Sequence, residues 1–148
     1  MTDSDRAVVS FSRKLASIRR MFREAHIFAE KQPCFRSVGT TVSHAERDVV
    51  DGDSRHPSVE VSFSVDGDLT QVIDEEKYSL GASVAIRFVQ NEWRAEGEVG
   101  WSCFTLGWDE YRSFEMISKS VVDLEDSIEA FVASVLNCYR EAIGQLTA

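Results

Sequence analysis

The side chains of this chain that could do chemistry are three histidines, three cysteines and 25 carboxylates. His26, His44 and His56 stand far apart, and no HxxxH, HExxH or CxxC spacing connects any of them to a second ligand. The carboxylates are so numerous that no pair of them stands out for acid–base work without a pocket. We therefore predict no metal ion, no cofactor and no catalytic residue, and we expect that the chain is not an enzyme.

The sequence also lacks the signatures of nucleotide binding and of serine hydrolases. It contains no GxxxxGKS/T, GxGxxG or GxSxG motif. Asp51-Gly52-Asp53 and Asp66-Gly67-Asp68 superficially resemble calcium loops, but both lack the further oxygen ligands and the closing Glu of an EF-hand. We interpret both segments as turns, and Asp66-Gly67 is the strongest two-residue hairpin signal in the chain.

The cysteines and the N-terminus bear on where the chain resides. Cys34, Cys103 and Cys138 share no short spacing, and each falls in a segment that we expect to be regular structure. This pattern favours three reduced, apolar core residues and a cytoplasmic setting. The first residues are polar and acidic, and no apolar run approaches the roughly 20 residues that span a bilayer. We expect neither a signal peptide nor a membrane-spanning segment.

The net charge of −9 is distributed unevenly along the chain. Residues 1–36 carry eight basic and four acidic side chains, whereas the remainder carries eight basic and 21 acidic ones. Such an acidic chain is predicted not to bind nucleic acid, because phosphate affinity comes from cations. An acidic surface suits a basic protein partner, since opposite charge speeds and directs the encounter. The alternative is that the charge serves only solubility.

Acidic side chains beside aromatic ones are the best candidates for contacts with a partner. Trp108 and Tyr111 flank Asp109 and Glu110, and an aromatic anchor with polar neighbours is typical of an interface. The predicted partner-binding residues are Asp48, Asp51, Asp53, Asp66, Asp68, Trp108, Asp109, Glu110 and Tyr111.

These residues need elements to position them, and the termini are predicted to be helices. Residues 4–31 carry apolar side chains at spacings of three and four, and Pro33 ends the helix. The apolar stripe is Val8, Phe11, Leu15, Ile18, Phe22, Ala25 and Ala29. The opposite side is basic. It can lie on an anionic membrane or an acidic partner, but we interpret it as the solvated face of a core helix.

The C-terminal helix is predicted to begin with Asp123 as its N-cap and to stop at Gly144. Its first turn carries further acidic residues, which favour the positive end of the helix dipole. The buried stripe is Leu124, Ile128, Phe131, Val135, Leu136, Tyr139 and Ile143.

The first half of the sheet is predicted from short alternating segments. A strand is expected from residue 34 to about 43, and the slip in alternation near Ser37-Val38 indicates either a bulge or an earlier start of the strand. Residues 46–57 are expected to form an exposed loop. A second strand over 59–65 is expected to turn at Asp66-Gly67 and return over 69–73.

Residues 78–103 predict two long strands, because apolar and polar side chains alternate almost without interruption. Trp93 and Trp101 fall on the apolar face, either as core or as the lining of a cavity. We predict a turn at Asn91-Glu92, which places Arg87 opposite Glu96 and avoids the like-charged Arg94. A last strand is expected over 108–117, where the irregular alternation indicates a bulge or an edge covered on both faces.

Together these elements predict a single α+β domain over residues 1–148. It consists of an N-terminal helix, an antiparallel meander of five or six strands and a C-terminal helix, with both helices on one face of the sheet in two layers. No motif identifies a family. The architecture is broadly similar to that of small acidic bacterial proteins that bind other proteins, such as toxin-immunity proteins and secretion chaperones.

The predicted function is a non-enzymatic protein-binding module for a basic protein partner, immunity-like or chaperone-like. The alternative is a small protein or enzyme that binds an apolar ligand in a cavity between sheet and helices. Homodimerisation through an uncovered strand edge is a further expectation and is compatible with either.

Overall fold

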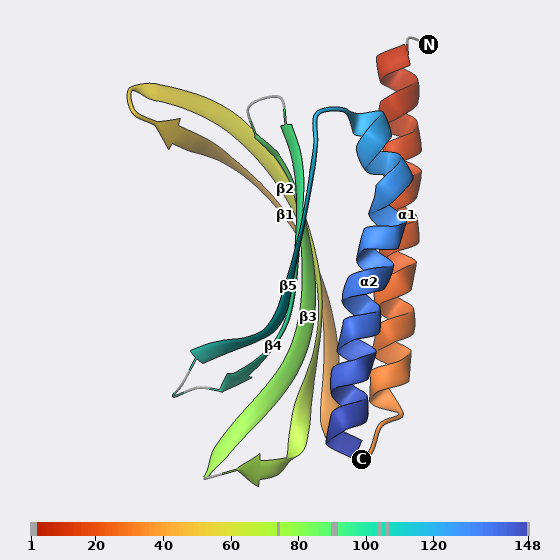
Figure 1. Cartoon of the computed structure of the whole chain (residues 1–148), viewed down its shortest axis with the longest axis vertical. Coiled ribbons are helices and arrows are strands. Elements are labelled where there is room, and N and C mark those ends of the chain that lie inside the picture. The colour runs from red at the N-terminus through yellow and green to blue at the C-terminus, as the bar shows by residue number, and fades with distance from the viewer. Residues whose placement is uncertain (1–2, 74, 90–91, 104, 106, 148) are drawn as a thin grey trace.

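The computed structural model describes residues 3–73, 75–89, 92–103, 105 and 107–147, which form two helices and five strands (Figure 1). The elements are α1 (Asp3–Glu30), β1 (Phe35–Asp51), β2 (Ser54–Ile73), β3 (Glu76–Val89), β4 (Glu92–Cys103), β5 (Gly107–Ser118) and α2 (Val121–Thr147). The strands form one antiparallel sheet in sequential order, β1-β2-β3-β4-β5. The predicted helix–meander–helix arrangement is confirmed.

Both helices pack against the same face of the sheet, side by side (Figure 1). α1 contacts β1 and β2, whereas α2 contacts β3, β4 and β5. The core between the layers contains Ile18 and Phe22 of α1, and the Phe22 ring stacks on Phe63 of β2 with ring centroids 5.7 Å apart. The prediction of two layers is therefore also confirmed. Neither helix, over its described residues, has an apolar stretch that could cross a membrane.

The apolar stripe of α2 is buried as predicted, and Tyr139 lies at its centre. Tyr139 is fully buried, and its hydroxyl donates a hydrogen bond of 3.1 Å to the carbonyl oxygen of Leu80 in β3. Burial, and secondarily the negative charge of Asp66, raise the pKa of Tyr139. In α1 the stripe is buried from Ile18 onward, while the side chain of Val8 lies outside the described residues.

The two predicted ends of α2 are both corrected. Ser120, not Asp123, is the N-cap, because its Oγ accepts the Asp123 N–H at 3.1 Å. Asp123 contributes negative charge within the first turn instead. Gly144 does not end the helix, which continues to Thr147. Burial of Ala142 and Ile143, with Leu146 packed on the core, offsets the cost of about 1 kcal/mol for a helical glycine.

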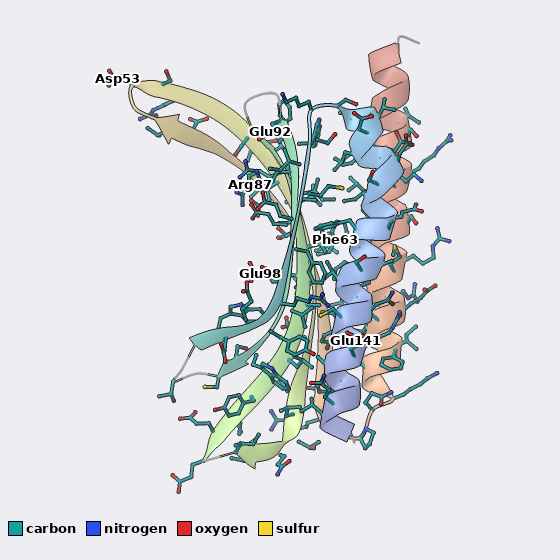
Figure 2. All side chains as sticks on the ribbon, in the orientation of Figure 1. Asp53, Phe63, Arg87, Glu92, Glu98 and Glu141 are labelled. Carbon is teal, nitrogen blue, oxygen red and sulfur yellow. The ribbon has the colours of Figure 1, made fainter. Side chains whose placement is uncertain are left out.

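Residues 46–57 form a hairpin rather than the expected loop. β1 extends to Asp51 and β2 begins at Ser54, so that the tight turn falls at Gly52, whose φ of 60° favours glycine. This β1–β2 arm bends away from the helices, with Asp53 at its tip (Figure 2). The polar composition that suggested a loop reflects an arm that no helix covers.

Asp66-Gly67 is not a turn, contrary to the prediction, and residues 69–73 are not a separate return strand. Both segments belong to β2, where Gly67 pairs with Val38 on one side and Leu80 on the other. A Cβ atom on Gly67 would lie 2.6 Å from the Phe35 ring. Gly67 therefore makes room for the buried Phe35 ring. This packing sets the strand conformation of Gly67 and outweighs the local preference of an Asp-Gly pair for a turn.

The register of β3 with β4 also differs from the prediction. Phe88 pairs with Trp93 and Arg87 with Arg94, which excludes the predicted turn at Asn91-Glu92; residues 90 and 91 themselves lie outside the described part. The two arginines face each other across the strands, but each forms an ion pair with a carboxylate. Arg87 contacts Glu60 of β2 at 2.8 Å and Arg94 contacts Glu92 at 3.2 Å.

Aromatic packing favours this register over the predicted one. The rings of Phe88 and Trp93 lie 5.0 Å apart, and Trp93 also contacts Phe11 of α1 at 5.3 Å. Such aromatic pairs contribute about 0.5–1.5 kcal/mol each beyond their buried area. Both predicted irregularities are present, as a register shift between Phe35 and Ser37 in β1 and another at Tyr111 in β5.

The sheet is strongly curved, with both ends bending away from the helices (Figure 1). The inner face, toward the helices, is therefore convex. The opposite face, which we call the outer face, is concave and is not covered by either helix. This face is where the chain can meet another molecule.

Gly97 of β4 allows α2 to approach the inner face, and this can be tested. A Cβ atom there would lie 2.5 Å from Cγ2 of Val135, so we expect Gly97→Ala to lower the free energy of unfolding by about 1–3 kcal/mol. The matched control is Gly39→Ala in β1, where a Cβ meets nothing within 4 Å and a change of at most about 0.5 kcal/mol is expected. Urea unfolding measures both; equal effects would contradict the tight approach of α2.

Candidate functional site

The outer face is built mostly from small side chains. Because alternate residues point to opposite faces, the strand residues between the core positions of β2, β3 and β4 all point outward. Two neighbouring cross-strand rows of this face are Thr41, Ser64, Ser83, Glu98 and Ser113, and Ser43, Ser62, Ala85, Glu96 and Glu115. The short side chains of β1 to β3 leave a shallow floor beside a group of carboxylates on β4 and β5.

Glu96, Glu98 and Glu115 form this group, which we call the outer acidic cluster. Glu96 and Glu115 are direct cross-strand partners, an arrangement that like charges disfavour. Glu98 lies two residues along the same strand and points away from the helices (Figure 2). Among the described side chains, none of the three has an ion-pair partner within 4 Å.

The outward-facing arginines of β3 and β4 do not neutralise this cluster. Arg87 donates from Nε to Glu60 at 2.8 Å, in addition to its second contact with the same carboxylate. Arg94 is held by Glu92. Neither arginine therefore forms an ion pair with a carboxylate of the outer acidic cluster.

A second feature of the outer face is a pair of neighbouring glycines, each covered by a larger side chain from another strand. Gly81 of β3 and Gly100 of β4 are direct partners, and Asp66 of β2 pairs with Gly81. A Cβ on Gly81 would overlap the Asp66 carboxylate, and one on Gly100 would lie 2.5 Å from Cζ2 of Trp108. The carboxylate and the indole thus lie against the two glycines. We call these four residues the glycine row.

Asp66 and Asp68 lie close together in β2 but have different surroundings. Asp68 accepts hydrogen bonds from Ser37 at 3.1 Å and Ser79 at 2.9 Å, and Arg36 lies 4.0 Å away. Asp66 has no ion-pair partner among the described side chains, although it remains accessible to solvent. Partial desolvation against the sheet, followed by repulsion from Asp68, raises the pKa of Asp66.

The structure brings together some of the predicted partner-binding residues and separates others. Asp66, Asp68 and Trp108 lie near one another on the outer face, and Glu110 is the cross-strand partner of Gly100.

The remaining predicted residues lie elsewhere. Asp48 and Asp53 are exposed on the β1–β2 arm, and the side chain of Asp51 lies outside the described residues. Asp109 lines an apolar pocket. The Tyr111 hydroxyl accepts a hydrogen bond from Gln145 of α2 at 3.1 Å.

Sequence reasoning missed the outer acidic cluster, although a signal was present. Glu96 and Glu98 stand at alternate positions of a strongly alternating strand, which places them on its polar face. The contribution of Glu115 could not be found this way, because the register of β5 against β4 decides which carboxylate it faces.

An apolar pocket of about 470 Å³ lies between the end of the sheet and the C-terminal end of α2. It is lined by Leu69, Ile73, Tyr78, Trp101, Gly107, Trp108, Asp109 and Leu146. The lower ends of the strands diverge from the helices in this region (Figure 1). Of the two inward tryptophans, Trp101 therefore lines a pocket, whereas Trp93 is packed among aromatic side chains.

A groove of about 570 Å³ lies between α1 and the edge strand β1. Arg19, Arg23 and His26 line it together with Thr40, whose hydroxyl lies 2.7 Å from Nδ1 of His26. Elsewhere the charge of α1 is matched within the chain, since Lys14 forms an ion pair of 3.3 Å with Glu129 of α2. The groove is basic, whereas the outer face is acidic.

The three cysteines are free thiols. Cys103 and Cys138 are buried and Cys34 is partly buried. Burial raises the pKa of Cys34 and of Cys138, which disfavours the reactive thiolate. Across the part of the chain that the structure describes, no three His, Cys, Asp or Glu side chains are grouped to hold a metal ion.

Comparison with known proteins gives no match: no protein-family model, no curated protein and no solved structure is significantly similar to this chain. The function therefore has to be argued from the outer face and the pockets themselves.

The raised pKa of Asp66 has a consequence for stability. A carboxyl group whose pKa is higher in the folded than in the unfolded state destabilises the fold when it is ionised. We expect Asp66→Asn to be more stable than the wild type at pH 7, and the difference to shrink as the pH falls toward the raised pKa. Urea unfolding at several pH values measures this. Glu24→Gln, on the exposed surface of α1, is the control with the same change of charge.

Proposed function

We propose that this protein is a non-enzymatic binding module whose outer face takes up a basic segment of a partner protein. The observation that carries the proposal is the outer acidic cluster, in which Glu96 directly faces Glu115 without a cation between them. A cationic side chain placed between these carboxylates would turn a repulsive pair into an attractive site. The concave form and the small side chains of the face allow a polypeptide to approach the sheet closely.

The net charge of the chain also favours a basic partner protein, because it acts over longer distances than contacts on the outer face. The chain carries a net charge of −9, so it attracts basic proteins and repels nucleic acid. An immunity-like or chaperone-like role in the cytoplasm, which consists of neutralising or escorting a basic partner, would use such a face.

The proposal is tested with a fluorescent, capped Gly-Arg repeat peptide at low and high ionic strength. Neutralising the cluster in E96Q/E98Q/E115Q should weaken binding at least about threefold, since an exposed charge pair contributes about 0.2–1 kcal/mol. Wild-type binding should fall as salt rises. Fluorescence anisotropy measures both effects.

The matched control is E24Q/D126N/E141Q, which removes the same charge from exposed helix positions (Glu141 is labelled in Figure 2). It should bind nearly as well as the wild type. Equal weakening in the two variants would show that net charge, not the outer face, attracts the peptide. A lack of binding at low ionic strength would contradict the proposal altogether.

The apolar pocket favours a second candidate function, the binding of a small apolar ligand. Its lining is mostly apolar, and its volume of about 470 Å³ lies within the range of ligand sites. It lies at one end of the two layers, and Trp101 of β4 and Leu146 of α2 both line it.

This second function is tested with Nile red, whose emission rises in an apolar site. We expect enhanced, blue-shifted emission with the wild type and its loss in Ile73→Glu, because Ile73 lines the pocket. Val72→Glu is the matched control, since Val72 is as exposed as Ile73 but does not line the pocket. Equal dye binding by both variants would exclude the pocket as the site.

A further inference from the structure

The glycine row has the form of a small recognition site on the outer face. Gly81 and Gly100 lie side by side, and their chain neighbours Leu80 and Val99 are fully buried on the inner face. The space that outward side chains of both glycines would take is filled by the Asp66 carboxylate and the Trp108 indole, and both glycines are buried. A carboxylate and an aromatic ring therefore lie close to the sheet on neighbouring strands of the concave face.

Asp66 covers Gly81. Its carboxylate lies against Gly81, where a side chain would displace it. Unlike Asp68, it accepts no hydrogen bond from a described side chain, and its pKa is raised by desolvation. A carboxylate held in this position lacks the cation or donor that would offset its desolvation.

Trp108 covers Gly100. Its ring lies against this glycine, and the residue is 44% exposed, a high value for so large an apolar side chain. Neighbouring strands are about 4.8 Å apart, so roughly one strand spacing separates the carboxylate over Gly81 from the indole over Gly100. A cationic group lying on the exposed face of the ring would contact the indole and the neighbouring carboxylate at once.

We propose that the glycine row binds the guanidinium group of one arginine side chain, supplied by the basic partner of the outer face. The planar guanidinium stacks on an indole and donates two parallel hydrogen bonds to a carboxylate, whereas the ammonium of lysine does neither as well. The inference rests on the proposed function, because the outer acidic cluster two residues along β4 attracts the segment that carries the arginine.

The proposal predicts which peptide binds and which indole responds. The probe is the capped Gly-Arg repeat peptide, compared with the same peptide containing citrulline, which keeps the shape but loses the charge. The chain has three tryptophans, and the indole N–H signal of Trp108 in an NMR spectrum is assigned from its loss in Trp108→Leu. We expect a saturable shift of this signal with the arginine peptide and none with the citrulline peptide.

Affinities of variants give a second measurement. Asp66→Asn and Trp108→Leu should each weaken binding about two- to fivefold, the size of a cation–π contact at an exposed site. Their controls are Glu24→Gln and Phe28→Leu, which remove a carboxylate and an exposed aromatic ring from α1, on the other side of the sheet. Both controls should bind like the wild type.

The outcomes separate this inference from the proposed function. If the peptide binds through the outer acidic cluster but leaves the Trp108 signal and both variant affinities unchanged, the arginine site is wrong and the proposed function stands. If the arginine and citrulline peptides shift the signal equally, a cation is not what the site recognises. If no peptide binds at low ionic strength, both proposals fail.

Discussion

The burial of one face of the sheet against two helices is the interaction on which the rest of the structure depends. Phe63, Val84 and Val99 of three successive strands are buried beneath α1 and α2, and Tyr139 joins the layers by its hydrogen bond to β3. This burial supplies most of the stability, since each fully buried side chain contributes about 1.5–3 kcal/mol. Because the inner face alone holds the layers together, the outer face is free to carry charges and glycines that a core would exclude.

Glycines serve opposite purposes on the two faces. On the inner face, Gly67 admits the Phe35 ring and Gly97 admits Val135, so that they increase packing. On the outer face, Gly81 and Gly100 are buried beneath the Asp66 carboxylate and the Trp108 indole, which they allow to lie close to the sheet. The first pair increases core packing, whereas the second weakens the strands and brings a carboxylate near an exposed indole.

The charged side chains of the outer face also fall into two groups, those with an ion-pair partner and those without one among the described side chains. Arginines that face each other across β3 and β4 are each matched by a carboxylate, while Glu96 and Glu115 face each other unmatched. Like charges opposite one another reduce sheet stability, and the buried inner face can support that cost. A cation from outside the chain would offset this repulsion, which is the physical basis of the proposed function.

The sequence by itself determined the layers. Period-two alternation over residues 78–103 and the two helical stripes leave one way to bury all three apolar surfaces. The slip near Ser37-Val38 lies close to the bulge of β1, whereas the irregular pattern of the last strand indicated an irregularity without its position. Only the tertiary structure decided the register of β3 with β4, the strand conformation of Asp66-Gly67 and the length of the β1–β2 arm. These depend on side chains distant in sequence: Phe35 against Gly67, Glu60 beside Arg87, and Phe11 on Trp93. For the same reason the approach of Asp66 to Trp108, 42 positions apart in the chain, exists only once four strands are in register.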